Sequence, residues 1–171
     1  MSKNSQSKYD NTILYLCKSL GGSVVGKKKI AKLLYYIDFD RYEFEESMQS
    51  VTGDTYKHWK MGPVPDNYTV RIDSLEVQGK LGHKSVDSGP EYQYPTEVFT
   101  CLSEPDLSVL DDVDLSIINH VVKKYGALSG KELEILTHKE APYIATEPNE
   151  AIPYDLAFYR GTDFSDVMAA A

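Results

Sequence analysis

The chain of 171 residues has only two cysteines and four histidines, and each scarcity excludes a class of site. Cys17 and Cys101 lie far apart in the sequence in apolar surroundings, so we interpret both as reduced core residues rather than as a disulfide or a reactive thiol. The histidines form no i, i+4 pair and have no cysteine at metal-ligand spacing. The sequence therefore predicts neither a metal site nor a bound cofactor.

The chain also lacks a long apolar run. No segment approaches the length that spans a bilayer, and the opening residues MSKNSQSKYD have no apolar middle like that of a signal peptide. We therefore expect a cytoplasmic protein without a membrane partner. The formal net charge of −8 disfavours binding to nucleic acid, because a phosphate backbone would be repelled in the absence of a local basic patch. An acidic surface suits a basic protein partner instead.

Apolar spacing in the remaining sequence is mostly helical. It predicts helices over residues 9–20, 28–46, 66–79 and 115–125, and one more that begins at the capping box of Ser129 and Glu132. Short strands are expected over residues 55–60 and 97–102. The expected fold class is mainly α (α with a small β-sheet), in a single compact helical domain.

No internal repeat or long linker divides the chain. We expect one domain over residues 8–165, between a disordered N-terminus at residues 1–7 and a flexible C-terminal tail at residues 166–171. From Pro142 onward the sequence is expected to be irregular.

GGSVVGKK, residues 21–28, nearly matches a phosphate-binding loop. Lys28 stands where Ser or Thr should hold magnesium, and a helical pattern precedes the loop where a buried strand should be. We interpret the segment as a connection between two helices. Lys27 and Lys29 complete a run of three cations at a helix N-terminus, where they oppose the helix dipole. We favour a solvated basic corner over a patch that contacts an acidic partner or the chain's own carboxylates.

Carboxylates gather in two places where acid–base chemistry or metal binding is conceivable. The two groups are Asp38, Asp40, Glu43, Glu45 and Glu46, and Asp111, Asp112 and Asp114. We interpret both as solvated faces, the second at a helix start where negative charge is favourable. His120, in the middle of a helix, is interpreted as a core histidine. With no nucleophile elbow and no Cys–His pairing, the sequence does not predict an enzyme.

TGDTYKHWKMGPVP, residues 52–65, contains the only tryptophan. Alternation in the predicted strand places Tyr56, His58 and Lys60 on one face. Thr55, Lys57 and Trp59 lie on the other face. We favour Trp59 as a core residue under the preceding helix, with Tyr56 and Lys60 outward; the alternative is an exposed anchor for a partner.

Together with KLLYYIDFDRYEFEES, residues 32–47, this motif resembles the Panacea domain of antitoxins, the family that includes SocA. In that family a KLLYY-like helix leads to a T-G-D-x-Y motif that continues to W and G-P-V. The matching blocks cover residues 29–66, with weaker likeness at HKEAPYIAT, where Tyr143 stands in place of a tryptophan that many relatives have.

The resemblance implies a mostly helical domain that is the antitoxin of a type II-like toxin–antitoxin pair in bacteria, phages or mobile elements. Such an antitoxin neutralises a cognate protein toxin, encoded nearby, by direct contact, and no enzymatic activity or cofactor is implied. The alternatives are a proteolytic adaptor that delivers the toxin to a ClpXP-type protease or, less favoured, a DNA-binding autoregulator. The ending VMAAA is similar to tags that such a protease recognises, although a frayed end is the favoured interpretation.

Two groups of residues follow from the motif. The expected structural residues are Lys32, Leu33, Leu34, Tyr35, Gly53, Asp54, Trp59 and Gly62. The expected toxin-binding residues are Tyr36, Tyr56, Lys60, Pro63 and Val64.

Overall fold

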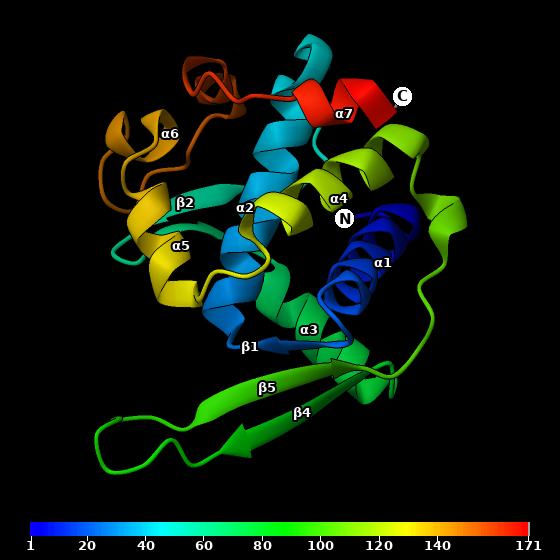
Figure 1. Ribbon diagram of the computed structural model, residues 1–171, viewed down its shortest axis with the longest axis vertical. Helices are drawn as coiled ribbons and strands as arrows, with labels where there is room; N and C mark the ends of the chain where they lie inside the picture. Colours follow the sequence, from blue (N-terminus) through cyan, green and yellow to red (C-terminus); the bar gives the residue numbers. More distant parts are fainter. Residues whose placement is uncertain (171) are drawn as a thin grey trace.

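The computed structural model describes residues 1–170, with side chains as far as Val167, as a helical body from one end of which an antiparallel hairpin projects (Figure 1). The centre of the body is α2 (Lys27–Glu43), in which every residue from Ile30 to Arg41 is buried. A helix that is buried on all sides is a core helix rather than an amphipathic surface helix. Its predicted extension to residue 46 is wrong, because the chain turns into the 3-10 helix η1 (Phe44–Glu46), with a positive φ of 54° at Glu45.

The other helices pack around α2 or extend from the shell that covers it. They are α1 (Lys3–Ser19), α3 (Tyr68–Val77), α4 (Asp112–Tyr125), α5 (Gly130–Thr137), α6 (Ala141–Ile144) and α7 (Ser165–Ala170), with 3-10 helices η2 (Leu107–Val109) and η3 (Tyr154–Tyr159). The predicted capping box of Ser129 and Glu132 is confirmed at the start of α5. Residues after Pro142, expected to be irregular, contain η3 and α7.

The expected disorder of residues 1–7 is wrong. The Ser2 side chain accepts a hydrogen bond from the Ser5 backbone N–H at 3.1 Å and so caps α1, which begins at Lys3. The polar residues that suggested disorder form the exposed first turns of a helix whose buried face begins at Tyr9. Capping satisfies backbone donors that would otherwise be exposed at the helix start.

The expected fold class also needs correction, because the strands form two separate sheets instead of one small sheet. About 51% of the chain is helical and 14% is strand. One sheet has the order β1 (Ser23–Val25), β5 (Thr96–Cys101), β4 (Leu81–Val86), and the other pairs β2 (Tyr56–Trp59) with β3 (Gly62–Pro65). All pairs are antiparallel. The segments that form β1 and β4 show too little of the alternation typical of strands to predict the three-stranded sheet from the sequence.

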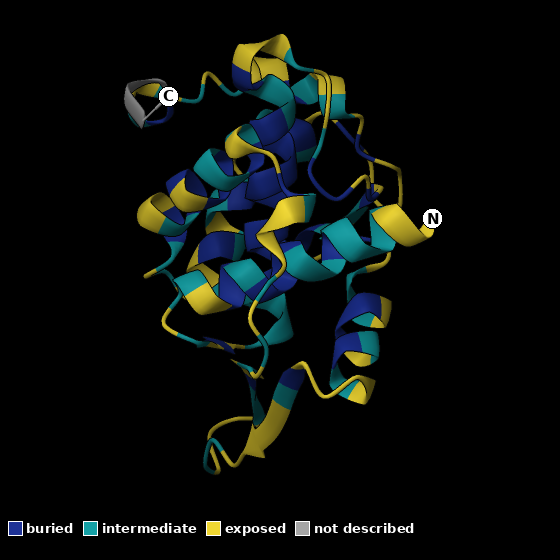
Figure 2. Ribbon diagram, turned by 90° about the vertical axis from the view of Figure 1, so that its right-hand side faces the viewer, coloured by how far each residue is buried: buried dark blue, intermediate teal, exposed yellow. Residues whose placement is uncertain are grey.

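The two sheets lie at different places on the body. β2 and β3 lie beside α2, whereas β4 and β5 extend beyond the helices and end in a loop over residues 87–95 (Figure 1). Burial follows the same division: the middle of the body is buried, while the far end of the β4–β5 hairpin is exposed (Figure 2).

Three apolar clusters fill the body, and α2 contributes to the two larger ones. Leu33, Ile37 and Phe39 pack in a cluster with residues of α4, α5 and η3, while Ile30 and Leu34 pack in a second cluster with α1, α3 and the three-stranded sheet. Because one helix supplies both cores, a shift of α2 would disturb the whole body. The helix that carries the first half of the sequence motif is therefore the structural centre of the fold.

The C-terminal segment was expected to be a flexible tail from residue 166. Instead, Val167 is 3% exposed and packs with Phe44 and Ile117, and Asp166 bonds to His120 at 2.7 Å. The expectation is therefore wrong for these two residues. The degradation-tag interpretation of VMAAA depends on side chains that lie outside the described residues.

Candidate partner-binding site

The candidate site is built on the β2–β3 hairpin, which we call the motif hairpin. Its register pairs Tyr56 with Pro65 and Trp59 with Gly62, so that Lys60 and Met61 form a two-residue turn. Gly62 has a φ of +99°, a backbone conformation that an L side chain rarely adopts. The glycine therefore permits the tight turn that closes the hairpin.

Asp38 in α2 attaches the segment before the hairpin to the core. Its carboxylate accepts hydrogen bonds from the backbone N–H groups of Val51 and Thr52 at 2.9 and 2.8 Å, and from the hydroxyls of Thr52 and Tyr56 at 2.5 and 2.6 Å. Burial raises the pKa of Asp38 to about 6, while these hydrogen bonds lower it. Asp38 is thus a buried acceptor for four donors and not a catalytic acid facing solvent.

Asp54, in the turn before β2, joins three more segments. Its carboxylate accepts hydrogen bonds from the Tyr9 hydroxyl at 2.8 Å and from the backbone and side-chain nitrogens of Asn67 at 2.9 and 2.8 Å. Tyr154 donates its hydroxyl hydrogen bond to the Asp54 carbonyl at 2.7 Å. The GD pair of the motif therefore connects α1, the start of α3 and η3.

Lys32 attaches the hairpin exit to α2. Its side chain is fully buried, and Nζ donates a hydrogen bond to the Pro63 carbonyl at 2.7 Å. Burial lowers the pKa of Lys32 to about 7. A Cβ at Gly62 would lie 3.1 Å from Nζ and 2.8 Å from the Thr137 hydroxyl, so the motif glycine also leaves the space that the lysine occupies.

The expected structural residues Leu33, Leu34 and Tyr35 lie in the core, each fully buried. Tyr36 and Tyr56, expected at the toxin interface, are also buried, and Tyr36 stacks on Tyr125 with ring centroids 3.9 Å apart. In this conformation neither tyrosine side chain is accessible to a partner that binds at the protein surface.

The face assignment of the predicted strand is wrong. Tyr56 points inward, because its hydroxyl bonds to Asp38, whereas Trp59 is 45% exposed. Trp59 occupies the last strand position before the turn. Alternation alone assigns two faces but does not say which one meets the core. Of the other candidates, Pro63 is buried, Val64 is half-buried and Lys60 is exposed.

The turn of the motif hairpin exposes Trp59, Lys60 and Met61, which we call the tip surface. Met61 is 53% exposed. The backbone beneath these side chains is held, because the Tyr143 hydroxyl donates to the Trp59 carbonyl at 2.9 Å and His138 Nε2 lies 3.0 Å from the Lys60 carbonyl. An exposed aromatic residue on a fixed backbone suits a protein interface, since little conformational entropy is lost on binding.

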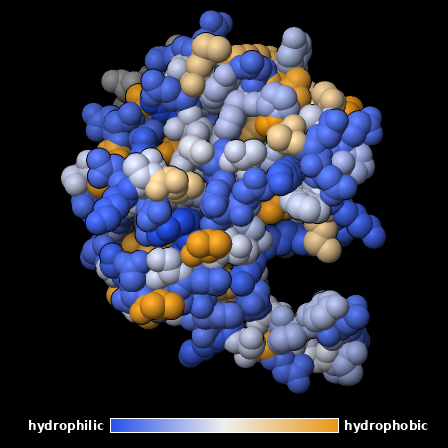
Figure 3. Space-filling model, turned by 180° about the vertical axis from the view of Figure 1, so that it is seen from behind, coloured by the Kyte–Doolittle hydropathy of each residue, from blue (hydrophilic) through white to orange (hydrophobic). Residues whose placement is uncertain are grey.

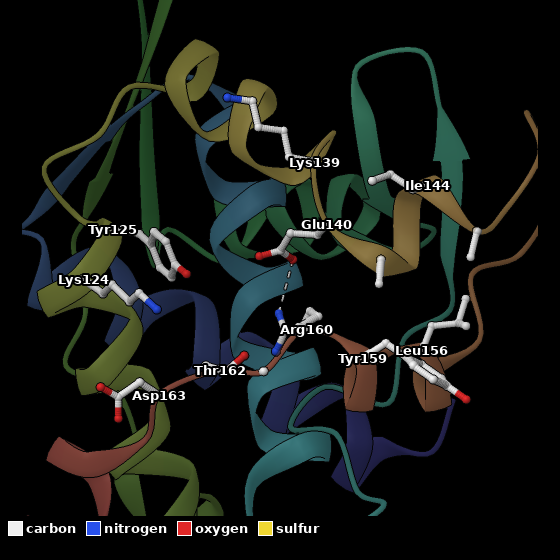
Figure 4. A pocket seen from close by; sticks show the side chains of 13 residues that line it. Lys124, Tyr125, Lys139, Glu140, Ile144, Leu156, Tyr159, Arg160, Thr162 and Asp163 are labelled. Carbon is white, nitrogen blue, oxygen red and sulfur yellow. Dashed lines mark hydrogen bonds and ion pairs between the residues drawn. The ribbon is translucent and has the colours of Figure 1, made fainter.

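A groove of about 840 Å³ opens on the other side of α6. It lies between the end of α4, the region of α5 and α6, and the residues of and after η3 (Figure 4). Ile144 is 68% exposed and Tyr159 is 78% exposed at its wall. Glu140 and Arg160 meet at its floor, where Figure 4 shows their ion pair. The groove and the tip surface adjoin, because Tyr143 of α6 bonds to the hairpin and its neighbour Ile144 lines the groove.

The first carboxylate group was interpreted as a solvated face, and this is wrong for its main members. Asp40 and Glu43 bind the Arg160 guanidinium at 2.5 and 2.7 Å, and Glu140 binds it at 3.4 Å. Burial raises the pKa of Asp40, although the Arg160 charge lowers it. The cluster attaches the segment after η3 to α2 and so fixes the floor of the groove. Removing one partner of a buried ion pair strongly destabilises a protein, because the other charge is left buried and unpaired.

The second carboxylate group is structural as well. Asp111 caps α4, and Asp114 is 1% exposed and binds Arg41 at 3.0 Å and Lys8 at 2.7 Å. The interpretation of this group as a helix start is confirmed, whereas solvation of Asp114 is not. His120 is buried, as predicted, with Nε2 3.7 Å from Asp40.

The segment that resembles a phosphate-binding loop contains β1 and a turn at Gly26 that precedes α2. Lys28 binds Glu134 at 2.6 Å, and Lys29 donates to the Gly126 carbonyl at 2.6 Å. The two lysines therefore contact the chain's own acceptors, the alternative that the sequence left open. Lys28 attaches α5 to the start of α2, and Lys29 attaches the end of α4.

Among residues 1–170, none of the helices is long and apolar enough to cross a membrane. No group of three or more His, Cys, Asp or Glu side chains in that part of the chain is arranged to hold a metal ion.

Sequence reasoning missed Met61, Ile144, Tyr159 and the pairing of Glu140 with Arg160. Met61 follows directly from the motif, since it occupies the turn beside Trp59, but the others come from short elements without apolar periodicity. Arg160 lies 120 positions from Asp40 in the sequence, and nothing in either local pattern connects them.

Comparison with known proteins gives one family. The family described as "Antitoxin SocA-like, Panacea domain" matches residues 30–143, which includes both halves of the motif, α6 as far as Tyr143 and the β4–β5 hairpin. No curated protein matches the chain, and no solved structure does.

Proposed function

Because the chain belongs to the SocA-like Panacea-domain antitoxin family, we propose that it neutralises a protein toxin encoded nearby by binding it directly. An antitoxin family implies a toxin partner in general terms. The proposal adds direct contact in the cytoplasm, without a chemical reaction, and a location for that contact at the tip surface and the adjoining groove.

The observation that carries this location is the exposure of Trp59 and Met61 on a backbone held by Tyr143 and His138. Tryptophan dominates binding energy at protein interfaces, and the groove beside it offers further apolar side chains at Ile144 and Tyr159. Fixing the hairpin by the buried contacts of Asp38, Asp54 and Lys32 lowers the entropy that binding would cost. The net charge of −8 also favours a basic partner.

A binding function, and not a catalytic one, is supported by the structural roles of the ionisable side chains that could otherwise act as acids or bases. Asp38, Asp40 and Lys32 are buried and engaged with other residues of the fold. The acceptors and donors that they use are backbone groups and side chains of the body. Substituting them is therefore expected to affect folding before it affects any activity.

The experiment is co-expression with the product of the adjacent gene. The wild-type chain should restore growth and purify as a complex with that product. Met61→Asp should lose both effects, while Val70→Asp, a matched change at an exposed apolar residue of α3, should retain them; the two side chains are 53% and 60% exposed. Failure of the wild-type chain to restore growth would refute the function, and equal behaviour of the two variants would refute the location.

The same experiment in a host without a ClpXP-type protease separates direct neutralisation from delivery for proteolysis. Restoration of growth that persists in this host supports direct binding. Restoration that disappears, while the toxin accumulates, indicates the adaptor function instead.

A further inference from the structure

His138, at the end of α5, contacts two backbone carbonyls with its ring. Nδ1 lies 2.6 Å from the carbonyl oxygen of Glu134, one helical turn earlier, and Nε2 lies 3.0 Å from the carbonyl oxygen of Lys60. Lys60 belongs to the tip surface and is 78 positions away in the sequence. We call these two contacts the clasp, because they join a helix to the exposed turn of the motif hairpin.

Both partners of the ring are hydrogen-bond acceptors. A carbonyl oxygen only accepts, whereas a neutral imidazole has one N–H donor and one nitrogen that itself accepts. The neutral ring therefore satisfies only one of the two contacts, and its other nitrogen turns a lone pair toward a carbonyl oxygen. A ring with hydrogens on both nitrogens donates to both carbonyls. The geometry of the clasp thus matches the protonated ring.

A neutral ring gives up the contact with the hairpin. The contact with Glu134 is the shorter one and lies within one helical turn, so it requires no other segment to be ordered. The contact with Lys60 joins two segments and restricts a turn, which costs conformational entropy. Loss of one proton from His138 therefore leaves the hydrogen on Nδ1 and takes the donor away from Lys60.

The charged side chains around the ring are exposed or engaged elsewhere. Those on the neighbouring elements are Lys60, Lys131, Glu134, Lys139 and Glu140. The Glu134 carboxylate binds Lys28 and Lys131 at 2.6 and 3.1 Å. Glu140 pairs with Arg160, and the other two lysines are exposed. In the part of the chain that the structure describes, no carboxylate is bonded to the ring, so the two carbonyls decide which form of the ring the clasp prefers.

Two aromatic side chains share this region. The ring centroids of Tyr143 and His138 lie 4.4 Å apart, and His58 stacks on Tyr143 at 3.7 Å. Burial raises the pKa of Tyr143, so its hydroxyl keeps the hydrogen that it donates to the Trp59 carbonyl. Nδ1 of His58 contacts the Thr146 hydroxyl, which can donate or accept, so either form of that ring makes this contact.

Lys32, behind the hairpin, responds to pH in the opposite direction. Burial lowers its pKa to about 7, so its attachment of the hairpin to α2 is favoured as the pH rises. A neutral amine still donates to the Pro63 carbonyl, which lies 2.7 Å from Nζ. A turn that loosens at higher pH is therefore not explained by Lys32.

We propose that His138 positions the tip surface only while its ring is protonated on both nitrogens. The clasped turn then binds one more proton than the released turn, so acidification favours the clasp and a rise in pH favours release. Histidine is the side chain that ordinarily changes its charge near neutral pH. Tyr143 still holds the Trp59 carbonyl after release, so the turn loosens while the hairpin stays paired. That the affinity for the toxin follows the clasp rests on the proposed function, whereas the clasp itself does not.

The test is nitrogen NMR of the wild-type chain at about pH 6.5 and about pH 8.5. The ring of His138 should show N–H groups at both positions at the lower pH and at Nδ1 alone at the higher pH. Over the same step the order parameters of the Lys60 and Met61 amides should fall from about 0.85 toward about 0.6. Both pH values lie above the pKa of Asp38, which is about 6, so that carboxylate stays mostly ionised.

Two substitutions separate the two ring nitrogens. His138→Gln places an amide N–H near the position of Nε2 and should keep the turn ordered at both pH values, because an amide donates without titrating. His138→Asn places the amide near Nδ1 and should leave the turn loose at both. His83→Gln, in the β4–β5 hairpin that stands apart from the body (Figure 3), should keep the wild-type response. The wild-type series decides the proposal even if a variant fails to fold.

Isothermal titration with the toxin at the same two pH values tests the consequence for binding. The affinity of the wild-type chain should fall about tenfold from the lower to the higher pH, while that of His138→Gln should not change. If no complex forms at either pH, the proposed function fails and the order parameters still decide the clasp. An unchanged wild-type affinity across a measured loosening would overturn the control of binding by the clasp.

Wild-type order parameters that are equal at the two pH values would overturn the clasp itself. A turn that becomes more ordered at the higher pH would assign the response to Lys32 and would also overturn it. The same holds for a folded His138→Gln variant that loosens as the wild-type chain does, because another group would then be responsible.

Discussion

The two hairpins of this molecule are both antiparallel, yet they differ in what holds them. The motif hairpin is attached to α2 and its surroundings by Asp38, Asp54 and Lys32, and only its turn is exposed. The projecting hairpin, β4–β5 with its loop, has exposed side chains on both faces over its outer half, and the aromatic residues of its loop, Tyr92 and Tyr94, are 67% and 74% exposed. The family motif lies in the first hairpin and not in the second.

The difference shows what the motif residues do. They are mostly buried hydrogen-bond donors and acceptors that fix one short hairpin on a core helix. The residues that this hairpin exposes to solvent are those of its turn. The outer half of the projecting hairpin has no such attachment, whereas its base is held by Leu81 and Phe99 in the second core cluster. Substitutions of the same type in the two hairpins should therefore have very different consequences.

Removing the acceptor at Asp38 should have the largest effect. Asp38→Ala leaves two buried backbone N–H groups and two hydroxyls without a partner, and we expect a loss of about 3–5 kcal/mol in the free energy of unfolding. Asp87→Ala, in the loop of the projecting hairpin, should change it by less than about 0.5 kcal/mol. Urea denaturation of the two variants measures the contrast, and equal losses would mean that the motif hairpin is not held through Asp38.

The buried Lys32 of the motif hairpin's attachment should make the free energy of unfolding depend on pH. Its pKa is lowered by burial to about 7 in the folded chain, below the usual value of 10.5, so the unfolded chain binds more protons between these values. The stability of the wild-type chain should therefore rise with pH relative to Lys32→Met, by about 2–3 kcal/mol from about pH 7 to pH 9. The matched variant Lys84→Met, on exposed β4, retains Lys32 and should keep the pH profile of the wild-type chain. A parallel pH profile for wild type and Lys32→Met would contradict the burial of a neutral amine.

The exposed residues of the two hairpins should differ in binding. Trp59→Ala should weaken the complex with the toxin about thirtyfold, or about 2 kcal/mol, with little change in stability. Tyr92→Ala removes an aromatic residue that is more exposed and should leave the affinity for the toxin unchanged. Isothermal titration with the purified toxin measures both, and a larger loss for Tyr92→Ala would move the toxin site to the projecting hairpin.

The smallest contrast concerns a single hydroxyl. Tyr56→Phe removes the hydrogen bond of 2.6 Å to Asp38 and should cost about 1–2 kcal/mol in the free energy of unfolding. Tyr92→Phe should be neutral within about 0.5 kcal/mol. Thermal melts that shift equally for the two variants would show that the buried hydroxyl contributes nothing beyond an exposed one.

Much of the body could be predicted from the sequence, because its cause is local. The spacing of apolar residues predicts the centre of α2 and the helix that ends at Tyr125, and the pair Ser129 and Glu132 predicts the start of α5. The strand over residues 55–60 is predicted as well, whereas its partner β3 is not, because Pro63 and Pro65 in that segment disfavour strand pairing. The residues of the resemblance led to the family that the comparison confirms.

The wrong predictions concern residues whose environment is set by segments that are distant in the sequence. Asp40 looks like a solvated carboxylate until Arg160 is brought beside it, and Tyr56 looks outward until Asp38 accepts its hydroxyl. The strand β1 has three residues and forms only because β5, more than seventy positions later, pairs with it. The polar start of α1 suggests disorder unless the cap at Ser2 and the anchor at Tyr9 are weighed together.

The central claim is that the tip surface of the motif hairpin contacts the toxin, and Trp59 permits a direct test because it is the only tryptophan in the chain. Labelling the chain with fluorotryptophan gives one fluorine resonance, which can be followed while unlabelled toxin is added. The account predicts that this resonance shifts and becomes shielded from solvent as the complex forms. A complex that forms while the resonance keeps its position and its solvent exposure would contradict it.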